Sequence, residues 1–240
     1  MTKMIVINLK MHFTKEEMKA YLDSLKNKLD HKLKLIICPS YLYLTMLKDY
    51  PFKIGAQNVY YQPKGAYTGE VSSFQLKSLA VEYVLLGHSE RRFYFKEDDL
   101  LINKKVKAVL DAKLKPIIFI GETKEEKEEL KTALILKNQL LIALKDIKVD
   151  DLNNVIIAYE PRWAVGSGNV PTIVEIKDTI NYIKDIINKN FDKELKVLYG
   201  GSVNKDNIKA INNLNNVDGL LIGSSALNEV YLISMLNNLN

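Results

Sequence analysis

The chain has 240 residues, of which 47% are hydrophobic, 26% charged and 9% aromatic, as is typical of a globular protein with a large core. Lysine and arginine total 34 and aspartate and glutamate 29, so the formal net charge is only +5. This small excess is spread along the chain and argues against nucleic-acid binding. No stretch holds the roughly 18 consecutive apolar residues of a membrane span, so we expect no membrane partner.

Cysteine and histidine are scarce, which bears on compartment and on metal binding. Cys38 is the single cysteine, so no disulfide can form within the chain, and the reducing cytoplasm is the expected location. No Cys/His cluster has the spacing of zinc ligands, and the N-terminal residues contain no long apolar signal core. We therefore expect a cytoplasmic protein that is globular throughout and has no metal site.

Short runs rich in leucine or β-branched residues recur along the chain, each about as long as a strand buried on both faces. They are Met4–Leu9, Leu33–Cys38, Lys53–Asn58, Tyr83–Leu86, Pro116–Ile120, Val155–Tyr159, Lys196–Tyr199 and Gly219–Ile222. Longer segments with helical spacing of apolar residues lie between them. Eight such units of about 30 residues predict a single α/β domain over residues 1–240, a (β/α)8 TIM barrel. The alternative fold is an open doubly wound sheet, which is expected to have a G-x-G-x-x-G turn after the first strand. The sequence has no such turn there.

Several helix starts can be predicted from local spacing. Thr14 with Glu17, and Thr172 with Glu175, have the spacing of a capping box, in which side chain and backbone hydrogen-bond reciprocally. Further N-cap candidates are Ser40, Ser72 and Ser225. The segment Lys124–Lys145 is predicted to be the longest and most charged helix, with a solvated outer face.

Candidate catalytic residues follow the predicted strands, where a barrel places its active site. Lys10 comes after the first strand, His88 after the fourth and Glu160 after the sixth. Taken singly, each of these is more often structural. Together they offer a carboxylate base, an imidazole to polarise a carbonyl and an ammonium to stabilise negative charge.

Turns rich in glycine and serine follow the seventh and eighth strands, at Gly200–Ser202 and Gly223–Ser225. In a barrel such turns hold phosphate through backbone N–H groups and a short helix N-terminus. The loop after Glu160 is rich in glycine and could close over the site. The combination predicts proton abstraction beside a carbonyl on a small phosphorylated substrate.

Seven segments carry a resemblance to a known family. They are Asn8–Met11, Ala56–Asn58, Gly65–Glu70, Gly87–Arg92, Ala158–Pro161, Tyr199–Val203 and Asp218–Gly223. In these segments, and over essentially its whole length, the chain resembles the triosephosphate isomerases. The resemblance implies a glycolytic and gluconeogenic isomerase that interconverts dihydroxyacetone phosphate and D-glyceraldehyde 3-phosphate without any cofactor.

The resemblance also implies a role for each site residue. Glu160 would move a proton between neighbouring carbons through an enediolate intermediate. His88 would act as a neutral electrophile, a property for which this family is itself the standard illustration. Lys10 would stabilise the oxyanion, with Asn8 orienting substrate and lysine and with Glu90 as a supporting partner. The phosphate would meet backbone N–H groups, those of Gly166, Ser202, Gly223 and Ser224.

The segment Val59–Glu70 is longer than a tight connection requires. By the resemblance it projects into a neighbouring subunit, with Thr68 reaching near that subunit's site, so a homodimer is expected. Tyr60, Tyr61 and Tyr67 supply area that such an interface could bury.

Six positions depart from the family pattern. Phe119 replaces a usual cysteine, Leu9 a tryptophan and His12 an asparagine. Arg162 stands where an apolar residue is common, and Pro171 stiffens the second hinge of the loop. Ser224 replaces a glycine of the last phosphate turn.

Two other functions stay open at the level of sequence. One is a barrel enzyme acting on a larger sugar phosphate, which would share the phosphate-binding turns. The other is an inactive homologue that binds phosphorylated metabolites or acts as a structural dimer. The presence of Glu160, His88 and Lys10 together favours the active isomerase.

Overall fold

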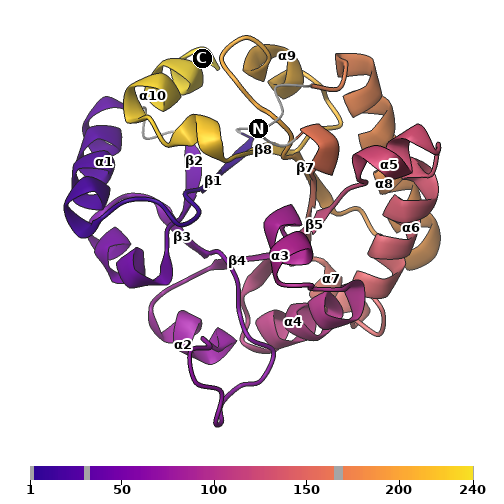
Figure 1. The fold of residues 1–240 in the computed structure, drawn as a ribbon, viewed down its shortest axis with the longest axis horizontal. Coiled ribbons are helices and arrows are strands. Elements are labelled where there is room, and N and C mark those ends of the chain that lie inside the picture. Colours follow the sequence, from indigo (N-terminus) through magenta and orange to yellow (C-terminus); the bar gives the residue numbers. More distant parts are fainter. Residues whose placement is uncertain (1–2, 30–32, 165–169, 240) are drawn as a thin grey trace.

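The computed structural model describes residues 3–29, 33–164 and 170–239. Eight parallel strands form a closed barrel in which each strand pairs with the next and β8 pairs with β1. Figure 1 looks into this barrel and shows the helices arranged around it. The predicted single-domain (β/α)8 barrel is therefore confirmed. Within the described ranges, no helix is both long and apolar enough to cross a membrane.

The strands lie where the apolar runs predict them, with end differences of at most two residues. They are β1 (Met4–Asn8), β2 (Lys34–Cys38), β3 (Lys53–Ala56), β4 (Tyr83–Leu86), β5 (Lys115–Ile120), β6 (Ile156–Tyr159), β7 (Lys196–Tyr199) and β8 (Gly219–Ile222). Alternate strand residues face opposite sides of the sheet. One buried cluster consists of strand residues alone, among them Val6, Cys38 and Phe119, and fills the barrel interior. The larger cluster joins the outer faces of the strands to the helices.

The helices follow the strands around the outside of the barrel (Figure 1). The α-helices are α1 (Lys15–Lys28), α2 (Ser73–Ser78), α3 (Ser89–Tyr94), α4 (Asp99–Asp111), α5 (Lys124–Glu128), α6 (Thr132–Ala143), α7 (Val149–Leu152), α8 (Ile173–Phe191), α9 (Ile208–Asn212) and α10 (Glu229–Asn237). Three 3₁₀ turns are η1 (Tyr41–Asp49), η2 (Arg162–Ala164) and η3 (Ser224–Ala226).

Local capping decides where several helices begin. The capping boxes predicted at Thr14 and Thr172 are both present, and Ser72 makes a third with Gln75. Ser40 occupies the N-cap position of η1 without a side-chain hydrogen bond. The prediction for Ser225 was wrong, because this residue lies inside η3 and Gly223 holds the N-cap position.

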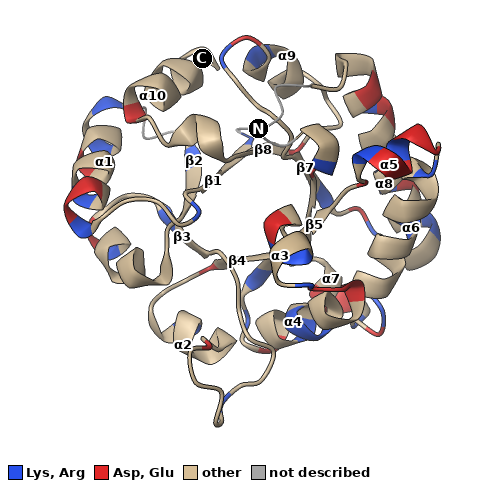
Figure 2. Cartoon of the chain, viewed as in Figure 1, with Lys and Arg blue, Asp and Glu red and all other residues tan. Residues whose placement is uncertain are grey.

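The prediction of one long helix over Lys124–Lys145 was also wrong. The segment forms two helices, α5 and α6, and the longest described helix is α8 with 19 residues. The break falls at Leu130, whose φ of 56° is left-handed, and the Lys131 N–H returns to the Glu126 carbonyl. Helical periodicity continues through this turn, so apolar spacing alone could not reveal it. Figure 2 shows the charged residues concentrated on the surrounding helices, with α5 densely charged.

The connection between β3 and α2 leaves the ring of helices and projects outward (Figure 1). It contains the predicted interface segment Val59–Glu70. Within it the Tyr60 ring centroid lies 4.5 Å from that of Tyr61 and 4.8 Å from that of Tyr67. The projecting segment is thus held by its own aromatic contacts.

Candidate active site

The predicted catalytic residues lie around one cavity of about 260 Å³. The cavity is lined from five strand ends, β1, β4, β6, β7 and β8. Its lining residues are Lys10, His88, Glu160, Gly200, Gly201, Ser202, Val203, Asn204, Leu221, Gly223, Ser224 and Ser225. Barrel closure is what brings these residues together, because they come from both ends of the sequence.

Glu160 follows β6 directly and is only 3% exposed. Its Oε2 accepts a hydrogen bond from the Ser89 N–H at 3.2 Å, and its Oε1 lies 3.2 Å from His88 Nε2. Burial raises the pKa of this carboxyl, but His88 and the Ser89 N–H outweigh burial and hold the pKa below its usual value. The Glu160 carboxyl is therefore ionised at neutral pH.

A close backbone approach fixes the position of Glu160. A Cβ placed on Gly121 would lie 1.8 Å from the Glu160 carbonyl oxygen, so only glycine fits there. The Glu160 N–H donates to the Ile120 carbonyl at 2.8 Å, continuing the pairing between β5 and β6 beyond the strand. The base is consequently anchored by the neighbouring strand as well as by its own.

His88 lies two residues after the end of β4 and is the N-cap of α3. Its Nδ1 accepts a hydrogen bond from the Glu90 N–H at 3.2 Å, which requires that Nδ1 carry no proton. Burial lowers the pKa of His88, while the carboxylates of Glu160 and Glu90 outweigh burial and raise it. The positive charge of Lys10 also opposes the carboxylates and lowers this pKa. The hydrogen-bond geometry is that of a neutral ring whose proton lies on Nε2, on the side of Glu160.

Lys10 adopts a left-handed backbone conformation with φ of 51°. Two side chains satisfy its backbone there: Asn8 Oδ1 accepts the Lys10 N–H at 3.0 Å, and the Gln57 amide donates to the Lys10 carbonyl at 2.7 Å. The Lys10 Nζ lies 2.7 Å from Glu90 Oε1. This places an ammonium at the cavity. Asn8 is buried, and its Oδ1 supports the Lys10 backbone; that it also orients the substrate stays a prediction.

The turns after β7 and β8 form a further part of the cavity wall. Ser202, Gly223 and Ser224 line it, and Ser224 begins η3, so the first N–H groups of that turn lie at this edge. The Ser202 hydroxyl donates to the Ala164 carbonyl. A Cβ on Gly223 would lie 4.0 Å from Lys10 Nζ, which shows how near the lysine comes to this turn. Gly166, the fourth residue predicted to contact the phosphate, lies outside the described residues.

The departures from the family pattern are accommodated in different ways. Phe119 and Leu9 are fully buried, and Phe119 faces the small Ala158 across the β5–β6 pairing. Arg162 Nε donates to the Gly121 carbonyl at 3.0 Å, and its Nη2 lies 3.2 Å from Glu126 Oε2. The residue in the first hinge is thus tied to the loop after β5.

Sequence reasoning did not assign the contacts that support the catalytic residues. Gln57 lies in a segment that matches the family, and that match was a signal of a functional residue. Its hydrogen bond to the Lys10 carbonyl could not be predicted from spacing. Nothing in the sequence marked Asn204 as a lining residue. Among the described residues, no three His, Cys, Asp or Glu side chains gather as they would around a metal ion. The expectation of a reaction without metal or cofactor stays a prediction.

Comparison with known proteins gives a consistent result over the whole barrel. The family model described as triosephosphate isomerase matches residues 3–239. A triosephosphate isomerase of Dehalococcoides mccartyi is 41% identical over 95% of this chain and 92% of its own length. Those of Alkaliphilus oremlandii and Clostridium botulinum are each 37% identical, covering 96% and 98% of this chain and 96% and 99% of their own lengths.

Proposed function

The chain belongs to the triosephosphate isomerase family, and from that premise we propose that Glu160, His88 and Lys10 carry out its isomerase reaction. The activity is that of a triosephosphate isomerase, an enzyme of glycolysis and gluconeogenesis. The observation that carries the assignment of residues is their convergence on one cavity with the turns after β7 and β8. A volume of about 260 Å³ suits a triose phosphate and counts against a larger sugar phosphate.

Glu160 is the base that takes the proton from the carbon beside the carbonyl and returns it to the neighbouring carbon. Its burial and its ionised state support this role, because a buried carboxylate loses few hydrogen bonds to water when substrate enters. The substrate would replace His88 as the neighbour of this carboxylate. The enediolate intermediate then carries its negative charge on the two substrate oxygens.

His88 and Lys10 stabilise that charge. The Nε2–H of a neutral imidazole donates to the substrate oxygens, and the Lys10 ammonium supplies positive charge. Glu90 supports both groups, since its N–H holds the imidazole and its carboxylate holds the ammonium. Asn8 supports the conformation of Lys10.

The phosphate is bound by backbone N–H groups of Ser202, Gly223 and Ser224. Gly166 is proposed as a fourth contact from the family resemblance alone. Binding of this nonreacting group supplies free energy that orders the site. Acid–base groups contribute roughly 10²–10⁴-fold to the rate, so they could not replace this contribution on their own. No cofactor enters the proposed reaction.

A coupled assay with D-glyceraldehyde 3-phosphate tests the assignment of residues. Glu160→Asp withdraws the carboxylate by one methylene while keeping its charge, so kcat should fall by about 10²-fold or more with the fold intact. Glu160→Gln should lower kcat further, because an amide cannot accept the proton. Near-wild-type activity in either variant would overturn the assigned base, and turnover of larger sugar phosphates at a similar kcat/KM would overturn the substrate class.

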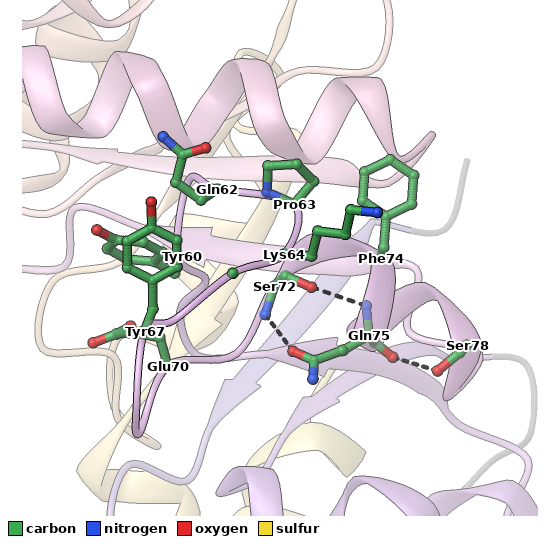
Figure 3. A pocket seen from close by; sticks show the side chains of 11 residues that line it. Tyr60, Gln62, Pro63, Lys64, Tyr67, Glu70, Ser72, Phe74, Gln75 and Ser78 are labelled. Atoms are coloured by element: carbon green, nitrogen blue, oxygen red, sulfur yellow. Dashed lines mark hydrogen bonds between the residues drawn. The ribbon is translucent and has the colours of Figure 1, made fainter.

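We also propose that the chain forms a homodimer through Val59–Glu70, with Thr68 near the partner's site. The projecting segment and α2 enclose a cavity of about 740 Å³ whose lining includes Tyr60, Tyr67 and Phe74 (Figure 3). Tyr67 is 42% exposed and Phe74 52% exposed, so a second copy would find apolar area here. Sedimentation at micromolar concentration should give twice 27.4 kDa, and a fully active 27.4 kDa species would refute the dimer.

A cytoplasmic location is proposed from the family's pathway and the single cysteine. Fractionation of the producing cells, with isomerase activity followed in each fraction, tests it.

A further inference from the structure

Phe119 is the largest side chain of the barrel interior close to the catalytic imidazole. It belongs to β5 and to the buried cluster of strand residues that fills the barrel. It is 1% exposed, and the small Ala158 pairs with it on β6. The ring therefore fills space that its small neighbour leaves free.

The Phe119 ring meets the His88 ring in an edge-to-face arrangement, with centroids 4.9 Å apart and planes inclined at 71°. Aromatic pairs prefer this geometry. The two hydrogen-bonding neighbours of His88, the Glu90 N–H and the Glu160 carboxylate, meet the nitrogens Nδ1 and Nε2. These contacts restrain the two nitrogens but do not touch the faces of the ring, which can still rotate slightly about the Cβ–Cγ bond. Packing against Phe119 acts on the ring itself and restricts that rotation.

One guanidinium group joins the backbones that carry the two rings. Arg92 Nε donates to the Gly87 carbonyl at 2.9 Å, and its Nη2 donates to the Phe119 carbonyl at 3.1 Å. Its third nitrogen, Nη1, lies 2.6 Å from Asp99 Oδ1. Since Gly87 directly precedes His88, these bonds fix the separation of the imidazole and the phenyl ring. The contact between the rings is thus held from both strands.

We propose that Phe119 is a positioning residue that sets the tilt of the His88 imidazole toward the substrate oxygens. The proposal rests on the role of His88 given above and adds to it. Phe119 does not line the cavity and exchanges no proton. It acts on the transition state only through the direction of the Nε2–H bond, where small misplacements have large effects on rate.

Phe119→Leu tests this proposal, because leucine keeps the site apolar and removes the ring. We expect kcat to fall by about 10-fold or more with KM changed less than about 2-fold, since substrate binding by the phosphate turns is untouched. Competitive inhibition by inorganic phosphate should be unchanged. The ¹⁵N chemical shifts of the His88 ring should move by more than the loss of the phenyl ring current alone accounts for, which a role limited to stability would not cause.

Ile117→Val is the matched control, since Ile117 also fills the barrel interior from β5. Its kcat and its His88 ¹⁵N shifts should stay at wild-type values. If Phe119→Leu changes kcat no more than Ile117→Val does, the proposal is wrong. Phe119→Met provides a second ring-free variant of different shape, should the leucine variant fold poorly, and the same expectations apply to it.

A background lacking the imidazole separates this proposal from the assignment of His88. In His88→Gln, whose own kcat should fall by about 10²-fold or more, adding Phe119→Leu should change kcat less than about 2-fold. An equal loss in both backgrounds would show that Phe119 acts independently of His88 and would overturn the proposal. Wild-type activity in His88→Gln alone would instead overturn the proposed role of the histidine.

Discussion

A buried ion pair beside the active-site helix gives the sharpest stability prediction. Lys105 lies on α4 and is 3% exposed. It forms an ion pair with Glu97, which lies between α3 and α4 and is 5% exposed. The Lys105 ammonium also donates to Asn58 Oδ1 at 2.8 Å. Arg91 Nε lies 2.6 Å from Glu97 Oε1, while Glu97 Oε2 has no hydrogen-bond partner in the described part of the chain.

Lys105→Met removes the charge while keeping a side chain of similar length. Breaking a buried pair by removing one partner costs about 3–5 kcal/mol of unfolding free energy, because the other charge is left behind. Here Arg91 still neutralises Glu97 in part, so we expect the lower end, about 3 kcal/mol. For a chain of this size that corresponds to a fall in Tm of roughly 6–12 °C.

Thermal and urea unfolding at matched protein concentration measure the loss, since association would otherwise shift the midpoint. Lys107→Met on the same helix is the control: its side chain is 39% exposed and its nearest carboxylate oxygen, in Asp146, is 3.8 Å away. That variant should lose less than about 0.5 kcal/mol. If the two variants lie within about 1 kcal/mol of each other, the reasoning from burial is refuted.

Three further predictions concern a helix cap, a close contact and a thiol. Thr172→Ala should lower the free energy of unfolding by about 1 kcal/mol, because it removes the cap of α8. The hydrogen bond from the Thr172 N–H holds the pKa of Glu175 below its usual value, so the destabilisation by Glu175→Gln should be present at pH 7 and fade as the pH falls through that lowered pKa. Gly121→Ala should abolish activity or folding, as measured by the coupled assay and circular dichroism, because its Cβ would overlap the Glu160 carbonyl; normal turnover would contradict this. Burial raises the pKa of the Cys38 thiol, so a thiol reagent at pH 8 should label the chain only in denaturant, and labelling of the native protein would show that this side chain is accessible.

Sequence determined the features that depend on a few neighbouring residues. The strands follow from short apolar runs, and the starts of α1 and α8 follow from capping boxes in which both partners lie within four positions. The location of Glu160, His88 and Lys10 followed from one further rule, that barrel enzymes place their chemistry at the carboxyl ends of strands. Of the two failed predictions, the single helix over Lys124–Lys145 fails where a left-handed residue interrupts a pattern that continues on both sides.

Tertiary structure alone decided which groups hold the proposed catalytic residues in place. Gln57 reaches Lys10 across 47 positions of sequence, and Arg92 reaches the Phe119 carbonyl across 27. The contact of Phe119 with the His88 ring likewise joins β5 to the turn that follows β4. Such contacts depend on the register and closure of the barrel, which place distant residues within a few ångströms of one another. Local spacing does not encode those distances. The sequence therefore marked the groups proposed to react, and the folded barrel decided how they are oriented.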